Sequence, residues 1–345
     1  MLTSGQATES APMKRQIPVT ALCAVLAAGL FAPLLTGASA LGFWLEVLLG
    51  GLMAGVLYSL VALGFVLIFK ASGVFNFAQG AMVLFAALTV ARLAERMPLW
   101  LAIFLAVAIM VVLAILIERL VLRPLVSQEA VALLMATLGL SYFLDGFGQT
   151  LWGSDIYSID LGIAREPVMI LDKVVQGGIL INRDDVAAAV VAVLLVGTLA
   201  LFFQKTATGR ALRAVADDHQ AAQSIGIPLN RIWVIVWSVA GVTAIVAGVI
   251  WGGKLGVQFS ISQVALKALP VVILGGFTSV PGAIIGGLII GVGEKMAEVF
   301  LGPPMVKAFD LAGGGIENWF AYVLALLFLL VRPEGLFGER HIDRV

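Results

Sequence analysis

The amino-acid sequence predicts an all-α polytopic membrane protein with about eight transmembrane helices and one broken pair of half-helices. Hydrophobic residues make up 61% and charged residues 12% of the chain, whereas charged residues make up about 25% of an ordinary soluble domain. The mean hydropathy of +1.07 supports the same class. The 21 basic and 21 acidic side chains balance, and no basic run interleaved with aromatic residues occurs, so a nucleic-acid partner is not expected.

Apolar runs long enough to cross a bilayer predict where the helices lie, since about 20 consecutive apolar residues span the hydrocarbon core. The first run follows Lys14 and Arg15 in the manner of a signal peptide. It is longer than the about 7 to 15 residues of a signal-peptide core, so we expect an uncleaved span. The predicted spans cover residues 19–35, 43–69, 78–94, 99–122, 130–151, 186–203, 232–251 and 319–331.

The bias of Lys and Arg toward cytoplasmic loops predicts the orientation. Basic residues occur in the N-terminal tail (1–16), in a polar segment (204–232) and at the C-terminal end, including the tail (336–345), so these parts are expected in the cytoplasm. Residues 153–185 carry six acidic side chains against three basic ones and are expected on the opposite side. Residues 17–335 then form one transmembrane domain.

One further apolar stretch, Val264–Phe300, is interrupted by glycines and a proline. Counting crossings, this stretch must enter and leave on the same side, as two half-helices over about 264–274 and 281–300 would. Irregular backbone at membrane depth needs partners from protein or a watery cavity, so we expect the break beside the substrate path. The alternative is a kinked single span with one orientation assignment wrong. The residues expected to form the break, as a gate or as simple packing, are Gly275, Gly276, Pro281 and Gly282.

Polar side chains inside apolar runs are candidates for the path, because an unpaired polar group in hydrocarbon costs several kcal/mol. The residues expected to line it are Asn76, Gln79, Thr137 and Thr278. Charged residues near span ends are instead expected to extend to the membrane surface; these are Lys254, Lys267, Glu294 and Lys295. Glycine pairs at small-xxx-small spacing predict close helix packing; these are Gly51 with Gly55, Gly282 with Gly286, and Gly287 with Gly291.

The polar segment from Lys205 to Ile232 predicts a docking surface for a soluble partner. Within it, small Ala residues and a helix-stopping Gly make a short helical knob suited to a groove in another protein. The alternative is an ordinary solvated amphipathic loop. The segment is similar to the cytoplasmic coupling loop of ABC importer permeases, whose hallmark is Glu-Ala-Ala, three residues, then Gly. Ala221, Ala222 and Gly226 match this hallmark, and Gln220 replaces its acidic residue.

Other segments resemble the branched-chain amino-acid ABC permease family and follow its order along the chain. Gln79 stands where that family more usually has His, which leaves the exact substrate open. The matching segments cover residues 58–69, 73–80, 208–215, 274–287 and 332–338.

The resemblance implies a permease subunit in a bacterial inner membrane, surrounded by lipid. Its implied partners are two ABC ATPase subunits, a second homologous permease subunit and an extracytoplasmic substrate-binding protein. ATP and Mg would be used by the partner subunits, and no cofactor is expected on this chain. The sequence agrees, because it holds no Gly-x-x-x-x-Gly-Lys-Ser/Thr phosphate loop. The residues assigned to ATPase coupling are Gly209, Arg210, Arg213, Gln220, Ala221, Ala222 and Gly226.

The implied cargo is a branched-chain or other small hydrophobic amino acid. Urea, short amides and aromatic acids remain alternatives within the same importer class. An autonomous channel or secondary transporter is a different class, for which the half-helix pair is the main argument. Neither catalysis nor a metal site is expected, since His219 and His341 lie in polar segments and no Cys/His metal spacing occurs.

Overall fold

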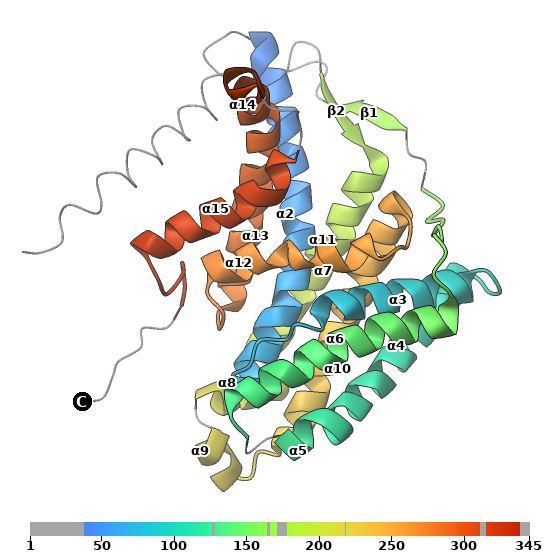
Figure 1. The fold of residues 1–345 in the computed structure, drawn as a ribbon, viewed down its shortest axis with the longest axis vertical. Coiled ribbons are helices and arrows are strands. Elements are labelled where there is room, and N and C mark those ends of the chain that lie inside the picture. The colour runs from blue at the N-terminus through green and yellow to red at the C-terminus, as the bar shows by residue number, and fades with distance from the viewer. Residues whose placement is uncertain are drawn as a thin grey trace, which may run out of the picture.

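The computed structural model describes residues 38–125, 128–163, 166–170, 178–217, 219–310 and 315–338. The predicted first span (19–35), the N-terminal tail and most of the C-terminal tail lie outside these residues. Helices make up most of the described chain (Figure 1), which confirms the all-α polytopic prediction.

The helices begin and end close to the predicted spans. Their bounds are α2 Ala38–Ser72, α3 Gln79–Ala94, α4 Leu99–Ile117, η2 Glu118–Leu122, α5 Arg123–Leu125, α6 Ala130–Trp152, α7 Arg183–Lys205, α8 Ala207–Asp217, α9 His219–Ser224, α10 Leu229–Leu255, α11 Ser260–Leu266, α12 Ala268–Gly275, α13 Val280–Met296, η3 Ala297–Leu301, α14 Gly302–Phe309 and α15 Ile316–Val331. Two strands not predicted from the sequence, β1 Pro167–Ile170 and β2 Ile179–Asn182, pair as an antiparallel hairpin.

Five of the described helices are long and apolar enough to cross a membrane, namely α2, α4 with its extension to Leu125, α6, α7 and α10. The apolar helices α3 and α15 are shorter. Residues 260–275 and 280–308 form a pair bent by 116° at the loop between them. These elements correspond to every predicted span beyond the first, and the bent pair corresponds to the predicted half-helices.

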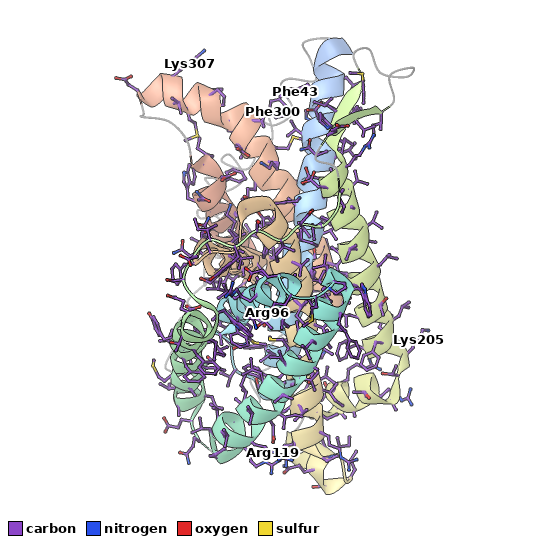
Figure 2. All side chains as sticks on the ribbon, turned by 90° about the vertical axis from the view of Figure 1, so that its right-hand side faces the viewer. Phe43, Arg96, Arg119, Lys205, Phe300 and Lys307 are labelled. Carbon is purple, nitrogen blue, oxygen red and sulfur yellow. The ribbon has the colours of Figure 1, made fainter. Side chains whose placement is uncertain are left out.

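The two polar segments expected on opposite sides lie at opposite ends of the molecule. Helices α8 and α9 are at the lower end of Figure 1, whereas the β1–β2 hairpin and α14 are at the upper end. The quarter-turn view separates the same ends, with Arg119 at the bottom and Phe43, Phe300 and Lys307 at the top (Figure 2). We refer below to the lower end as the α8 end.

The core forms around α2, which runs along most of the long axis and packs against α10 and α13. A seam of glycines joins α2 to α13: a Cβ atom on Gly55 would lie 2.6 Å from the Gly287 carbonyl oxygen, and one on Gly51 would lie 2.7 Å from the Val292 Cα atom. Only residues without a Cβ permit this approach. The packing predicted for these glycines is therefore observed.

The outer helices α4, α6 and α7 expose large apolar side chains, among them Phe104, Met135 and Leu194. By contrast, Leu60, Val61 and Phe65 in the middle of α2 are completely buried. This is the arrangement expected of a central helix surrounded by helices that face lipid.

Candidate functional site

The loop between α12 and α13, residues 276–279, is the predicted helix break, and its backbone conformation depends on glycines in and beside it. Gly276 has a φ of +101°, which L side chains rarely adopt. Gly275 and Gly282 lie backbone against backbone across the loop, so neither position has room for a Cβ atom. Ser279 caps α13, since its hydroxyl accepts a hydrogen bond from the Gly282 amide at 3.0 Å, and Pro281 follows within the first turn.

The C-terminal segment docks onto this break. The Leu336 amide donates to the Leu274 carbonyl at 2.8 Å, and the Phe337 amide donates to the Gly275 carbonyl at 3.2 Å. Carbonyls that α12 leaves open at its end are thereby satisfied. The segments 274–287 and 332–338, which each resemble the same family in the sequence, therefore contact one another in the structure. Neither segment predicts this contact by itself.

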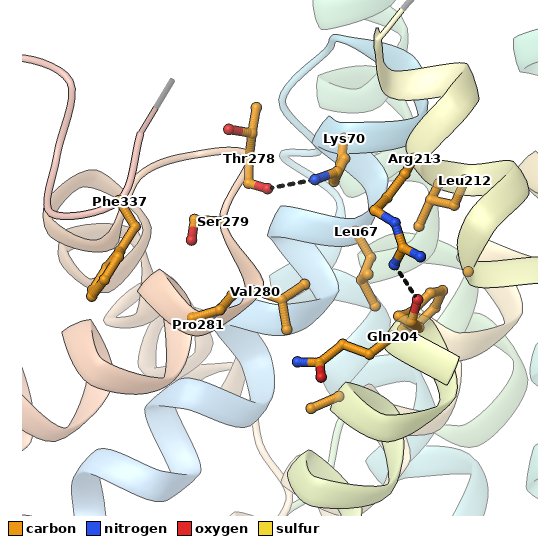
Figure 3. A pocket seen from close by; sticks show the side chains of 13 residues that line it. Leu67, Lys70, Gln204, Leu212, Arg213, Thr278, Ser279, Val280, Pro281 and Phe337 are labelled. Carbon is orange, nitrogen blue, oxygen red and sulfur yellow. Dashed lines mark hydrogen bonds between the residues drawn. The ribbon is translucent and has the colours of Figure 1, made fainter. Parts of the chain in front are cut away.

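A cavity of about 240 Å³ lies between the break and helix α8 (Figure 3). The Lys70 ammonium, in the last turn of α2, donates to the Thr278 carbonyl at 3.2 Å. The Arg213 guanidinium of α8 donates to the Phe203 carbonyl at 2.6 Å. The cavity is lined by Leu67, Lys70, Ala200, Phe203, Gln204, Gly209, Leu212, Arg213, Thr278, Ser279, Val280, Pro281 and Phe337. Thr278 and Pro281, which are predicted for the path and the break, thus share one cavity with Gly209 and Arg213, which are predicted for ATPase coupling.

Helix α8 is fixed against the end of α7. The Thr206 hydroxyl accepts from the Gly209 amide at 3.2 Å, which satisfies one of the open donors of the first turn. Gly209, Leu212 and Val215 form its buried face, and a Cβ atom on Gly209 would collide with the backbone of Phe203. Arg210 is exposed and lies outside the cavity lining.

Helix α9 ends at a glycine, as the sequence predicts. Gly226 has a φ of +86° and follows Ser224 by two residues, and its amide donates to the Gln223 carbonyl. Ala222 is buried, whereas Ala221 and Ile225 are exposed. The Gln220 side chain lies outside what the structure describes. The result is a short helix that presents Ile225 at an exposed tip at the α8 end of the molecule.

The other predicted path residues lie at another helix break, residues 73–78 between α2 and α3. We call this the first break and the loop 276–279 the second break, in the order of the chain. Asn76 accepts from the Ala78 amide at 3.0 Å, and the Thr137 hydroxyl accepts from the Phe77 amide at 3.4 Å. The side-chain amide of Gln79 donates to the Ala240 carbonyl at 3.4 Å. All three side chains are buried, at 0% to 3% exposure. Asn76, Gln79 and Thr137 therefore come together, but they seal this break, and only Thr278 of the predicted path set lines the cavity.

Aromatic rings connect the two breaks. Phe75 from the first break stacks on Phe65 of α2 at 4.9 Å and meets Phe277 from the second break edge-on at 6.2 Å, measured between ring centroids. Phe69 and Phe77 complete the cluster. Phenylalanines within apolar segments resemble ordinary core residues, so these rings carry no functional signal in the sequence.

The expectation that Lys267 and Glu294 extend to the membrane surface is wrong. The Lys267 ammonium pairs with the Glu294 carboxylate at 3.0 Å, and the Tyr58 hydroxyl donates to the same carboxylate at 3.1 Å. Glu294 is only 3% exposed. The junction of α11 and α12 places Lys267 beside α13 in the interior, where pairing offsets the cost of burying each charge. Lys254 instead pairs with Asp185, and Lys295 pairs with Glu298 in a half-exposed position.

Among the residues described, no group of three or more His, Cys, Asp or Glu side chains is arranged to hold a metal ion.

The chain matches the family model described as "Branched-chain amino acid transport system / permease component" over residues 47–332. The chain belongs to this permease family. The matched range contains both helix breaks, the α8–α9 segment and all of the predicted path residues. As a member of the family, the chain is a transport permease component and a multi-pass protein of the inner membrane.

Curated relatives match over most of their length. The high-affinity branched-chain amino acid transport system permease protein BraD of Pseudomonas aeruginosa is 30% identical over 88% of this chain and 98% of its own. LivH of Salmonella typhimurium, a permease protein of the same kind of system, is 27% identical with the same coverage. A probable branched-chain amino acid transport permease protein LivH of Methanocaldococcus jannaschii is 31% identical over 81% of this chain and 88% of its own.

Proposed function

We propose that this chain is the membrane-spanning subunit of an ATP-driven ABC importer for branched-chain or other small hydrophobic amino acids. It works with two separate ABC ATPase subunits, a second homologous permease subunit and an extracytoplasmic substrate-binding protein. ATP and Mg are bound by the ATPases, and both termini of this chain lie in the cytoplasm. Full-length similarity to branched-chain amino acid permeases supports the cargo class.

The observation that carries this proposal is the continuity between the expected docking surface and the helix break. Helices α8 and α9 share one end of the molecule, where Ile225 and the Gly226 stop form an exposed tip. Helix α8 and the break loop line the same cavity. A force that a soluble ATPase exerts on α8 therefore acts on a surface that adjoins the break.

The contacts suggest how movement is transmitted. Lys70 links the end of α2 to the Thr278 carbonyl, and Phe277 in the same loop meets Phe75 of the first break. A displacement of α8 changes the cavity, whose lining on the opposite side includes Thr278 and Ser279 of the non-helical loop 276–279. We propose that this loop shifts during the cycle and that the Phe75–Phe277 contact opens to admit cargo between the two breaks.

The chemistry near the breaks suits a small apolar cargo. The rings of Phe69, Phe75 and Phe277 are each partly exposed and adjoin one another. Neutral groups from Asn76 and Thr137 lie next to them but already have partners. Aromatic acids, urea and short amides stay alternatives, which competition for the cognate binding protein would separate.

The coupling assignment is tested at Gly226. In proteoliposomes that contain the complete transporter, Gly226→Trp should lower uptake at least about tenfold while ATP hydrolysis continues, because the bulky side chain spoils both the positive φ and the fit of the tip. Gly226→Asn is the matched control, since Asn tolerates this backbone conformation and adds little bulk. Unchanged uptake by the Trp variant would remove α9 from the coupling surface.

The importer class has its own test. Liposomes that hold this chain alone should show no substrate flux until the second permease, the ATPases, the binding protein and ATP are added. Flux through the isolated chain would instead assign it to the autonomous channels or secondary transporters.

A further inference from the structure

Among the described residues, the lining of the cavity at the α8 end contains two positive charges and no carboxylate. Its lining contains Lys70 and Arg213 but neither Asp nor Glu. Within the part of the chain that the structure describes, neither cation forms an ion pair, and each donates only to a backbone carbonyl. Uncompensated cations that share one cavity favour an anionic occupant.

The polar groups around these cations suit an anion better than a zwitterion. Thr278 and Ser279 contribute hydroxyls, and Gln204 contributes an amide. The ammonium group of an amino acid would find only neutral oxygen acceptors among the described lining residues, and the Thr278 and Phe203 carbonyls already accept from Lys70 and Arg213. The two cations would repel that ammonium. The cavity is therefore a poor resting place for the proposed cargo.

The position of the cavity points to the lipid headgroup layer. It lies where the apolar helices α2 and α7 end, at Ser72 and Lys205. Helix α7 faces outward, and Leu201, next to the lining residue Ala200, is 60% exposed. Basic pockets between transmembrane helices at the cytoplasmic face are the usual binding places of acidic phospholipid headgroups.

We propose that this cavity binds the headgroup phosphate of an anionic phospholipid, with Lys70 and Arg213 as its cationic ligands. The apolar part of the lining, including Leu67, Leu212 and Phe337, accepts the adjoining glycerol and the upper acyl chain. Because the same cavity separates α8 from the break loop, the bound phosphate connects the coupling helix to the loop. This inference concerns lipid binding and does not depend on the identity of the cargo.

The test measures lipid retention by the purified full-length chain. Native mass spectrometry of the chain in detergent, titrated with phosphatidylglycerol or with phosphatidylcholine, should show preferential retention of phosphatidylglycerol. Lys70→Gln and Arg213→Gln should each weaken that retention about fivefold, the effect expected for one cation near a headgroup. Arg213→Lys should keep most of it, which separates loss of charge from loss of folding.

Arg210→Gln is the matched control, because it removes the same charge from the same helix but lies outside the cavity lining. It should leave retention within about twofold of the unaltered chain, since Arg210 is not among the residues that line the cavity. Equal weakening by Arg210→Gln would overturn the proposal by showing a diffuse surface charge effect. Displacement of the lipid by millimolar inorganic phosphate would overturn it in favour of a free-anion site. Loss of ATPase binding in the Lys70 variant with unchanged lipid retention would reassign the cavity to an acidic side chain of the partner.

Discussion

The two breaks in the helical bundle are satisfied in different ways. At residues 73–78, buried side chains of Asn76 and Thr137 take up the free backbone amides. At residues 276–279, the flanking backbone is held by the C-terminal segment, and Lys70 reaches the loop from the edge of a cavity. The first break is held by buried side chains, whereas the second break is held by residues that lie beside the cavity.

This difference assigns the two breaks different mechanical roles. A polar network that is buried and fully paired resists displacement, because each lost hydrogen bond leaves a costly unpaired group. A loop whose contacts adjoin a cavity can shift without vacating a packed core. The proposed mechanism therefore predicts that the first break is a fixed wall and that the second break is the element that α8 moves.

The largest expected effect concerns the ion pair between Lys267 and Glu294, which joins the two half-helices on either side of the second break. Lys267→Met leaves the Glu294 charge buried without its cation, which should cost about 3–5 kcal/mol of stability. Thermal unfolding in detergent measures this loss. Lys295→Met is the matched control, since both members of its pair with Glu298 are about 40% exposed, and it should change stability by less than about 1 kcal/mol.

The double variant Lys267→Met with Glu294→Gln should recover most of the stability, because it removes both charges together. If the single and double variants unfold at the same temperature, the ion pair does not stabilise the packing of the two half-helices.

A smaller effect distinguishes the backbone of the two breaks. Gly73 and Gly276 both have positive φ, but a Cβ atom on Gly73 meets open space whereas one on Gly276 would lie 2.8 Å from the Gly338 amide nitrogen. Gly73→Ala should cost about 1 kcal/mol from backbone strain alone. Gly276→Ala should cost about 2–3 kcal/mol and loosen the C-terminal segment. Limited proteolysis of that segment together with thermal unfolding measures both consequences, and equal behaviour of the two variants would argue against the docked tail.

The smallest effect tests whether the first break is a sealed wall. Thr137→Val keeps the side-chain shape but leaves the Phe77 amide without its acceptor, which should cost about 1–2 kcal/mol. Thr137→Ser restores the hydroxyl and should remain close to the unaltered protein. A loss of transport affinity in the Val variant without any loss of stability would instead place Thr137 in contact with cargo.

Local patterns predicted those features that depend on local chemistry. Apolar run length located the long apolar helices of the described chain, and the Gly/Pro segment located the break at 276–279. Glycine spacing predicted close helix packing at these glycines, though not that α2 and α13 are the partners, and Gly226 predicted the end of α9. Each of these depends on residues within a few positions of one another.

The features that the sequence did not predict depend on distant residues. Lys267 and Glu294 each resemble a charge near a span end, and only the turn between α12 and α13 brings them together. The contact between Thr137 and the Phe77 amide likewise depends on how α6 packs beside the first break. The residues proposed for the path therefore divided between a sealed break and an open cavity, a division that polarity alone does not encode.

The glycine seam between α2 and α13 has a consequence for how the protein can work at all. With backbone pressed against backbone along Gly51, Gly55 and Gly287, neither helix can rotate or slide without forcing atoms through one another. The two helices therefore form one rigid unit, and the parts of the protein that move must move relative to it. The distance between two probes, one on each of these helices, should therefore be the same in every state of the transport cycle. This makes the helix pair a suitable frame of reference for measuring all other motion.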